Sequence, residues 1–368
     1  MMPVFDIFLT APPGLESVLA DEARAEGFAQ PVAVAGGVNT RGDWSEVWRA
    51  NLTLRGATRV LVRIGTFRAF HLAQLDKRAR KFPWGDVLRP DVALRVEVST
   101  DKRSKIYHAG AAQQRIERAI TETLGAPIAA DAPVTLKVRI DDNLVILSLD
   151  SSGETLHKRG HKLATGKAPL RETLAALLLR QMGYDGSQPV VDPMCGSGTF
   201  VIEAAEWAAG LMPGRGRDFA FMRFAGFDAA AWDRLRGATA RRPAPAQYFG
   251  YDRDAGAIRG AAQNAENAGV QDLTHFAMQP LSDLVPPPGT PPGLVMINPP
   301  YGERIGNRKL LFGLYGSLGA VLAERFRGWR LGLVTSDGGL ARATGLRLSE
   351  GPPVPHGGLK VRLYQADL

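Results

Sequence analysis

From residue 170 onward, short apolar segments alternate regularly with amphipathic segments, and this alternation limits the fold more than any other feature of the chain. The apolar segments end at Asp192, Asp252, Asn298 and Thr335. Short strands that alternate with helices predict a parallel sheet with helices on both faces. Ligands of such sheets bind beyond the carboxyl ends of the strands. We therefore expect an α/β domain whose site lies at these strand ends.

The first 165 residues follow a different pattern, in which strand-like and helix-like segments are mixed. Residues 92–98 alternate with period two, and residues 112–124 have an apolar helical face. Residues 134–149 predict a hairpin that turns at Asp141-Asp142-Asn143. We expect a small α/β module here, and we place the main domain boundary near the polar, basic stretch 151–167.

The composition is that of an ordinary globular protein, since 45% of the 368 residues are hydrophobic and 22% are charged. At ~150 residues per domain, this length predicts two domains or three small ones. The net charge of +8 favours an anionic partner. A single cysteine excludes a disulfide framework and a zinc ribbon, so we expect a reducing, cytoplasmic setting. We expect no signal peptide, because Met1–Thr10 has no basic region followed by an apolar run. We expect no membrane span, because no window reaches about 18 uncharged apolar residues.

Two stretches concentrate positive charge. Residues 55–81 carry eight arginines and lysines against one aspartate, and aromatic residues lie among or just after them. One interpretation is a solvated helix face beside core aromatics; the other is a surface that binds phosphates and stacks on bases. The segment between Trp207 and Gln247 has seven arginines against three aspartates, and it is either a solvated helical excursion or a second surface for RNA.

The first candidate site is the loop from Val191 to Thr199, between a predicted strand and a predicted helix. Gly196 and Gly198 let the backbone approach a ligand closely. A dinucleotide fingerprint would need a third glycine where Val201 stands, which argues against NAD. The carboxylate of Asp192 would repel a pyrophosphate but attract an ammonium group, and S-adenosylmethionine carries such a group.

The second candidate site is Asp252 at the end of the next strand. A carboxylate in this place can accept hydrogen bonds from both ribose hydroxyls. The alternative is a helix N-cap, because a helix begins near Ala255. Asp254 suits the cap and Asp252 suits the ribose, so both interpretations can hold. No role follows from the sequence for Asn264 and Asn267 in this helix.

The third candidate site is Asn298-Pro299-Pro300-Tyr301, which follows another strand. The two prolines stiffen the turn and remove two N–H donors. The Asn298 side-chain oxygen and the Pro299 carbonyl could then both accept hydrogen bonds from one exocyclic amino group. This would expose the nitrogen lone pair to a methyl donor, while Tyr301 stacks on the base. The alternative is a plain Asn-Pro turn.

The cysteine and two of the histidines are given structural rather than catalytic interpretations. Cys195 could be a nucleophile, but transfer to an amino group needs no covalent step, so we interpret it as a small buried filler. His157 and His161 would need further ligands to bind a metal. We therefore expect no metal site and interpret these histidines as part of a basic surface segment.

Together these residues resemble the class I S-adenosylmethionine-dependent methyltransferases that carry a THUMP RNA-binding domain, and most of all the bacterial guanine-N2 methyltransferases of large-subunit ribosomal RNA. The resemblance covers nearly the whole chain. It is carried by residues 8–16, 156–160, 168–172 and 192–199, by Asp252, and by Asn298–Arg304, which reads Asn-Pro-Pro-Tyr-Gly-Glu-Arg.

The resemblance implies a ferredoxin-like domain over residues 1–65, a THUMP domain over 66–165 and a catalytic domain over 166–368. The catalytic domain would have the Rossmann-like seven-stranded sheet of class I methyltransferases. The resemblance also implies which residues hold the cofactor and the target amino group. The cofactor residues are Asp192, Met194, Gly196, Gly198, Thr199, Phe200, Asp252 and Arg253. The target would be held by Asn298, Pro299, Pro300 and Tyr301.

One departure concerns the adenine of the cofactor. The family usually has an acidic residue after the third strand, where this chain has Pro280. Asp283, or a backbone carbonyl, would have to replace that contact. Pro280 is also the one feature that favours a non-catalytic RNA-binding assembly factor with a relic cofactor site.

The implied activity is methylation of guanine N2 in RNA, most of all in 23S ribosomal RNA, with S-adenosylmethionine as the cofactor. The implied partner is this RNA or a large-subunit assembly intermediate, with no membrane and no metal. An alternative is N6-adenine methylation of DNA or RNA, because the same tetrapeptide suits that amino group.

Overall fold

The computed structural model describes residues 4–163, 170–238, 240–301 and 308–368. The chain divides into two compact units, each built from separate segments. The N-terminal unit comprises Met1–Thr10, Ala23–Leu156 and Arg217–Ala238, and the C-terminal unit comprises Ala11–Glu22, His157–Gly216 and Thr239–Leu368. The finer division into three domains stays a prediction.

The N-terminal unit is built on one sheet of seven strands in the order β2-β3-β1-β4-β7-β6-β5. Neighbouring strands are antiparallel except β5 and β6, which are parallel. The strands are β1 (Phe5–Thr10), β2 (Ala29–Val34), β3 (Gly37–Gly42), β4 (Arg59–Arg68), β5 (Leu94–Thr100), β6 (Val134–Asp141) and β7 (Leu144–Asp150). The helical segments are α2 (Trp44–Thr53), α3 (Leu72–Arg80), η1 (Trp84–Asp86), α4 (Ala109–Leu124), η2 (Ala220–Arg223) and α7 (Ala229–Gly237), and α1 (Glu16–Ala25) crosses the division between the units.

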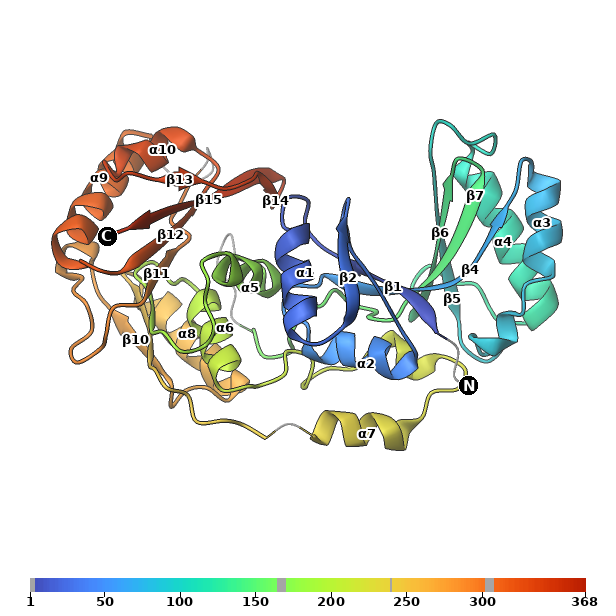
Figure 1. Cartoon of the computed structure of the whole chain (residues 1–368), viewed down its shortest axis with the longest axis horizontal. Coiled ribbons are helices and arrows are strands. Elements are labelled where there is room, and N and C mark those ends of the chain that lie inside the picture. Colours follow the sequence, from blue (N-terminus) through green and yellow to red (C-terminus); the bar gives the residue numbers. More distant parts are fainter. Residues whose placement is uncertain (1–3, 164–169, 239, 302–307) are drawn as a thin grey trace. The chain divides into compact units, whose positions relative to one another are not determined.

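Local sequence explains the second half of this sheet. The predicted hairpin is confirmed: β6 and β7 are joined by Asp142 and Asn143, whose φ angles of 47° and 63° suit a tight turn. The predicted helix is also confirmed, since α4 ends at Gly125 with a φ of 83°. Helices α3 and α4 pack side by side (Figure 1) and bury Leu75 and Ile116.

The basic stretch 55–81 differs from the helical interpretation. Its first part forms β4, which pairs with both β1 and β7 in the middle of the sheet. Val60 and Val62 are buried on this strand, whereas Arg63 is half-buried. The solvated helix face is therefore wrong for residues 59–68, because alternation with period two makes this segment a strand. β4 also runs through the domain boundary expected at residues 65 and 66.

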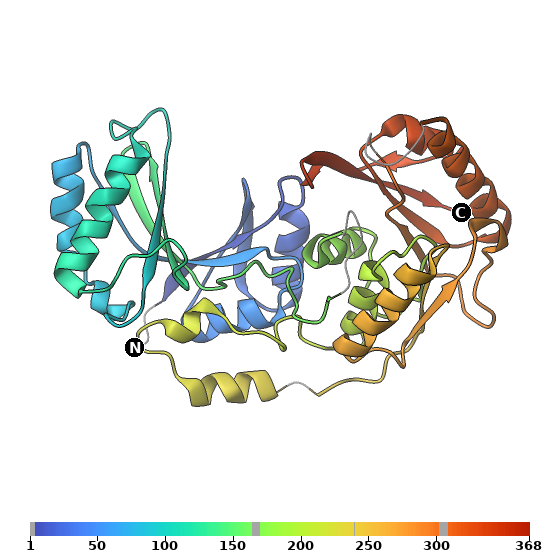
Figure 2. The ribbon, with the colours of Figure 1, turned by 180° about the vertical axis from the view of Figure 1, so that it is seen from behind.

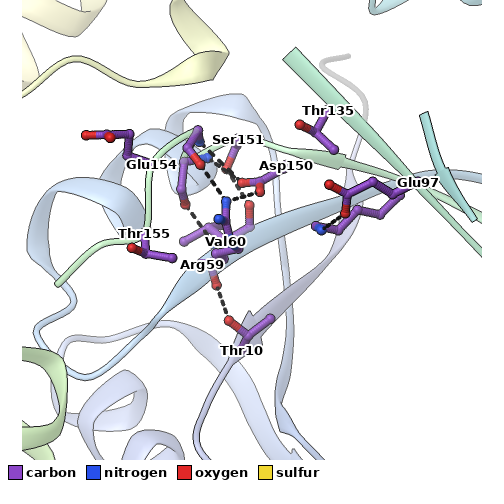
Figure 3. A network of polar contacts seen from close by, with 12 residues as sticks. Thr10, Arg59, Val60, Glu97, Thr135, Asp150, Ser151, Glu154 and Thr155 are labelled. Atoms are coloured by element: carbon purple, nitrogen blue, oxygen red, sulfur yellow. Dashed lines mark hydrogen bonds and ion pairs between the residues drawn. The ribbon is translucent and has the colours of Figure 1, made fainter. Parts of the chain in front are cut away.

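A polar network ties the start of β4 to the end of β7 (Figure 3). The Arg59 guanidinium contacts the Asp150 carboxylate and donates to the carbonyl of Gly153. Burial raises the pKa of Asp150, although the charges of Arg59 and Lys137 oppose that shift. The Ser151 hydroxyl donates to the Val60 carbonyl at 2.7 Å. These contacts join the two halves of the sheet into one unit.

The arginine-rich segment after Trp207 is not simply solvated. Its residues 217–238 belong to the N-terminal unit, where Phe221 stacks on Trp48 with ring centroids 6.0 Å apart. Phe221 also meets Trp232 edge-on at 5.0 Å. Arg217 donates to three backbone carbonyls of residues 152–155. This part of the segment therefore contributes aromatic side chains to the core, and Arg217 ties it to residues 152–155. The interpretation as a solvated helical excursion does not hold for this part.

The C-terminal unit contains the predicted α/β sheet, in the order β10-β9-β8-β11-β12-β15-β13, and β14 pairs with β15. The first five of these strands are parallel, and β15 is antiparallel to β12. The α/β prediction is confirmed, with β14 as an eighth strand. The strands are β8 (Val190–Asp192), β9 (Tyr248–Asp252), β10 (Thr274–Met278), β11 (Leu294–Ile297), β12 (Arg330–Thr335), β13 (Ser349–Glu350), β14 (Val354–His356) and β15 (Leu359–Asp367). The helical segments are α5 (Glu172–Gln181), α6 (Thr199–Ala208), α8 (Ala255–Ala268), η3 (Leu281–Asp283), α9 (Arg308–Arg325) and α10 (Gly338–Ala343).

Both faces of this sheet are buried. Val295 and Ile297 of β11 pack with Tyr315 of α9 in one apolar cluster. The alternate residues Leu294 and Met296 are equally buried and point to the other face. Figure 2 shows α6 beside α8, and both contact β9 and β10. No described helix is both long and apolar enough to cross a membrane.

Candidate functional site

The first part of the site is the turn between β8 and α6. Asp192 is the last residue of β8 and is only 3% exposed. Its carboxylate accepts a hydrogen bond from the Met194 N–H at 3.0 Å. Burial, with a contribution from the Asp252 carboxylate, raises the pKa of Asp192 to about 8. Burial removes the water that would stabilise the charged form of this carboxylate, so a bound cation stabilises that form strongly.

The two glycines of this turn have positive φ angles, 52° at Gly196 and 82° at Gly198. A side chain at Gly196 would project into open space, whereas one at Gly198 would meet the Phe276 ring at 3.0 Å. Gly196 therefore leaves room above the backbone, and Gly198 lets β10 approach α6. This is the environment expected of a loop that a ligand approaches closely.

Asp252 ends β9 and is held by two backbone groups. One carboxylate oxygen accepts from the Gly196 N–H at 3.1 Å, and the other accepts from the Asp254 N–H at 3.0 Å. Asp254 caps α8 by accepting from Gly256 and Ala257, so the predicted N-cap is confirmed. Since each carboxylate oxygen has a second lone pair, Asp252 can still accept ribose hydroxyls.

The other predicted cofactor residues have different surroundings. Phe200 is 1% exposed and lies in the core, while Met194 packs beside the cluster around α9. The Thr199 hydroxyl accepts from the Lys162 ammonium at 2.8 Å. Arg253 is exposed. Asp283 is also exposed, on the short η3 turn that follows Pro280, and its contact with adenine stays a prediction.

Cys195 lies near the carboxylates of Asp192 and Asp252. Its N–H donates to the Tyr251 carbonyl at 2.9 Å, and its side chain is buried. Burial, together with the nearby Asp192 and Asp252, raises the pKa of the Cys195 thiol far above its usual range. A thiol that stays protonated is a poor nucleophile, which agrees with its interpretation as a filler.

The third part of the site is the corner after β11. The Asn298 side-chain oxygen, Oδ1, is buried and has no hydrogen-bond partner among the described residues. The Pro300 carbonyl accepts from the Tyr315 hydroxyl at 3.3 Å. Tyr301 packs against the cluster around α9, and burial raises its pKa to about 12. Gly302, Glu303 and Arg304, the rest of the motif, lie outside the described residues.

Several supporting residues escaped the sequence interpretation. Asn264 of α8 is fully buried; its amide donates to the Ser197 carbonyl at 3.1 Å, and its oxygen accepts from the Leu163 N–H. Lys162 contacts Thr199 and also Glu172, at 3.0 Å. The only sequence signal was an amide on the apolar face of a helix.

The basic surface expected around residues 157–161 is wrong. Arg159 and His161 are buried, and they face Glu203 and Glu206 on α6 at 3.3 and 3.8 Å. Burial and neighbouring arginines and lysines lower the pKa of His157 to about 4. Sequence spacing could not reveal these pairs, because the carboxylates lie more than 40 residues further along the chain. Among the described residues, no cluster of histidine, cysteine and acidic side chains could hold a metal.

The three parts lie side by side, because β8 is hydrogen-bonded to β9 on one side and to β11 on the other. One edge of the sheet thus combines two carboxylates, an open glycine turn and a buried amide oxygen to which no described residue donates. Such a set can hold a cationic, ribose-containing molecule beside a planar amino group.

Comparisons with known proteins give the same assignment. Residues 159–363 match the family described as RMKL-like, methyltransferase domain, and residues 6–61 match the RlmL ferredoxin-like domain. The chain is 38% identical to the ribosomal RNA large subunit methyltransferase K/L of Syntrophotalea carbinolica, over 98% of this chain and 53% of that protein. It therefore spans about half the length of this relative.

Two further matches cover almost the full length of both this chain and the matched protein. The Synechocystis protein slr0064, whose name proposes an RNA methyltransferase, is 33% identical over 98% of this chain and 96% of its own. The solved structure of SMU.472, complexed with SAH, has a TM-score of 0.85 at 28% identity, over 100% of this chain and 99% of that one. With more than half of its length matched by one domain model, the chain belongs to the RMKL-like methyltransferase-domain family.

Proposed function

We propose that this chain methylates the exocyclic amino group, N2, of a guanine in RNA, with S-adenosylmethionine as the cofactor. The most favoured substrate is 23S ribosomal RNA or a large-subunit assembly intermediate in the cytoplasm. The observation that carries the proposal is the buried Oδ1 of Asn298, which has no partner in the described part of the chain and lies beside two carboxylate-bearing strand ends. A buried acceptor without a partner costs about 1–3 kcal/mol, so a site that keeps one gains from a donor brought by the substrate.

The described residues fit the cofactor. Asp192 offers a buried carboxylate to the ammonium group, and Asp252 offers its remaining lone pairs to the ribose hydroxyls. The open space over Gly196 leaves room for a ligand against the backbone. When bound, S-adenosylmethionine supplies an electrophilic methyl group.

The corner would act on the target base. Asn298 Oδ1 and the Pro299 carbonyl accept the two N–H groups of the exocyclic amine and draw its nitrogen away from planarity. The lone pair, otherwise delocalised into the ring, becomes available for attack. Tyr301 would stack on the base after the nucleotide has left its own stack. Positioning therefore supplies most of the catalysis.

The substrate class is supported by the names of the relatives and by the charge of the chain. The K/L relative is named for large-subunit ribosomal RNA, and slr0064 is named for RNA. The net charge of +8 suits a phosphate backbone. The N-terminal unit, which contains most of the ferredoxin-like match, would bind this RNA.

Radiolabelled S-adenosylmethionine tests the proposal directly. The purified chain is incubated with 23S ribosomal RNA or with duplex DNA, and the products are digested to nucleosides for mass spectrometry. N2-methylguanosine from RNA is the expected product. N6-methyladenine would favour the alternative target, and RNA binding without S-adenosylhomocysteine binding would favour a non-catalytic assembly factor.

A further inference from the structure

Tyr315 lies next to the target corner but belongs to a different element. It is on α9, 14 residues beyond Tyr301, and its side chain is 0% exposed. Its hydroxyl donates to the Pro300 carbonyl at 3.3 Å, and the Thr335 side chain lies near the same hydroxyl. Thr335 is the last residue of β12, which pairs with β11. The hydroxyl therefore holds the chain just after β11 at a place where the end of the neighbouring β12 is close by.

The corner needs an anchor of this kind. Pro299 and Pro300 have no N–H groups, so neither can donate a backbone hydrogen bond to fix the turn. β11 ends at Ile297, just before the corner, so the sheet ladder does not extend to the prolines. A fully buried phenol is held by its ring, and its hydroxyl can therefore fix a carbonyl without a large loss of entropy.

We propose that Tyr315 is a positioning residue, which holds the Pro300 carbonyl so that the Asn298 oxygen and the Pro299 carbonyl keep the direction needed to accept the target amino group. This inference rests on the proposed function. The competing explanation is that Tyr315 only fills the core. The two explanations differ in the hydroxyl alone, because phenylalanine preserves the ring.

The test compares Tyr315→Phe with Tyr184→Phe. Tyr184 is a matched control: it is 3% exposed in the same unit, and its hydroxyl donates to a backbone carbonyl, that of Ala204, at 2.8 Å. Positioning predicts a kcat about tenfold lower for Tyr315→Phe, because a small misplacement of reacting groups is costly. The dissociation constant of S-adenosylhomocysteine should change less than about twofold, and thermal stability should fall no more than in the control.

A second measurement does not depend on activity. The side-chain amide of Asn298 gives a ¹H–¹⁵N signal that is assigned by its loss in Asn298→Ala. The signal should shift in Tyr315→Phe and stay in place in Tyr184→Phe. An unmoved signal, or a kcat equal to that of the control, overturns the positioning role. If the wild-type chain itself fails to methylate RNA, the proposed function fails, and the amide signal still decides whether Tyr315 orients the corner.

Discussion

Asp252 ends β9 and Asn298 directly follows β11, the two strands on either side of β8, yet their side-chain oxygens differ in their hydrogen bonding. Both carboxylate oxygens of Asp252 accept from backbone N–H groups, and Asp192 accepts from Met194. The Asn298 oxygen has no partner among the described residues. Backbone N–H groups therefore orient the proposed cofactor carboxylates, whereas the described residues supply no donor to the proposed target acceptor.

The largest expected effect comes from substitution of Asn298. Asn298→Ala should lower kcat about 100- to 1,000-fold, by analogy with the loss of one preorganised group that stabilises a transition state. Binding of S-adenosylhomocysteine, measured by calorimetry, should be unchanged. Asn39→Ala is the matched control, because Asn39 on β3 also has a buried oxygen without a described partner. Near-normal turnover of Asn298→Ala would refute the role of the corner.

Asp252→Ala tests the proposed role of the Asp252 carboxylate in cofactor binding. Removal of an acceptor for two ribose hydroxyls should weaken S-adenosylhomocysteine binding about 10- to 100-fold, since a hydrogen bond to a charged group contributes about 1.5–3 kcal/mol. Equilibrium dialysis or calorimetry measures the change. An unchanged affinity would mean that Asp252 merely orders the glycine turn through Gly196.

The raised pKa of Asp192 predicts a pH dependence. Below its pKa of about 8 the carboxyl group is protonated in the ligand-free protein, so it must lose a proton to pair with an ammonium group. Affinity for S-adenosylhomocysteine should therefore rise up to about tenfold per pH unit from pH 6 to pH 8. Asp192→Asn should abolish this slope. A slope that persists in the variant would assign it to another group.

The raised pKa of Asp192 gives the free energy of unfolding a pH dependence opposite to that of cofactor affinity. The folded protein holds this proton between the ordinary carboxyl pKa and about 8, whereas the unfolded chain does not. The Asp192 contribution to the free energy of unfolding is therefore present at low pH and is lost as the pH rises to about 8.

The smallest expected effect separates Asp254 from Asp252. Asp254→Ala removes the cap of α8 and should lower the free energy of unfolding by about 1 kcal/mol. Urea denaturation measures this loss. Cofactor binding should stay normal, because Asp252 is contacted by the backbone N–H of residue 254, which the substitution retains. Weaker binding in this variant would show that cap and pocket are coupled.

Sequence alone predicted the elements whose signals are local. The helix from Ala255 to Ala268 begins where it was predicted to begin, and the hairpin at Asp142 and Asn143 has the predicted turn. The strand ends at Asp192 and Asp252 are also where the alternation placed them. Periodicity, caps and turn residues act within a few positions, so they can be read from the chain directly.

What escaped prediction depends on residues far apart in the chain. Arg159 seemed to belong to a basic surface, but its partner Glu203 lies 44 positions away on α6. Asn264 stayed without a role because the backbone that it supports, at Ser197, comes from another loop. The Tyr315 hydroxyl likewise acquires its meaning only when α9 packs over β11. No local pattern encodes such pairs.

The aromatic contribution of residues 217–238 has a consequence for synthesis of the protein. Phe221 stacks on Trp48 of α2 and Trp232 packs against Phe221, but the ribosome adds both long after α2 and the strands of this unit. The N-terminal unit therefore cannot complete its apolar core until translation has passed residue 238. A nascent chain stalled before that point should be unusually sensitive to proteases and chaperones, and no single cut can release the amino-terminal half as an intact body.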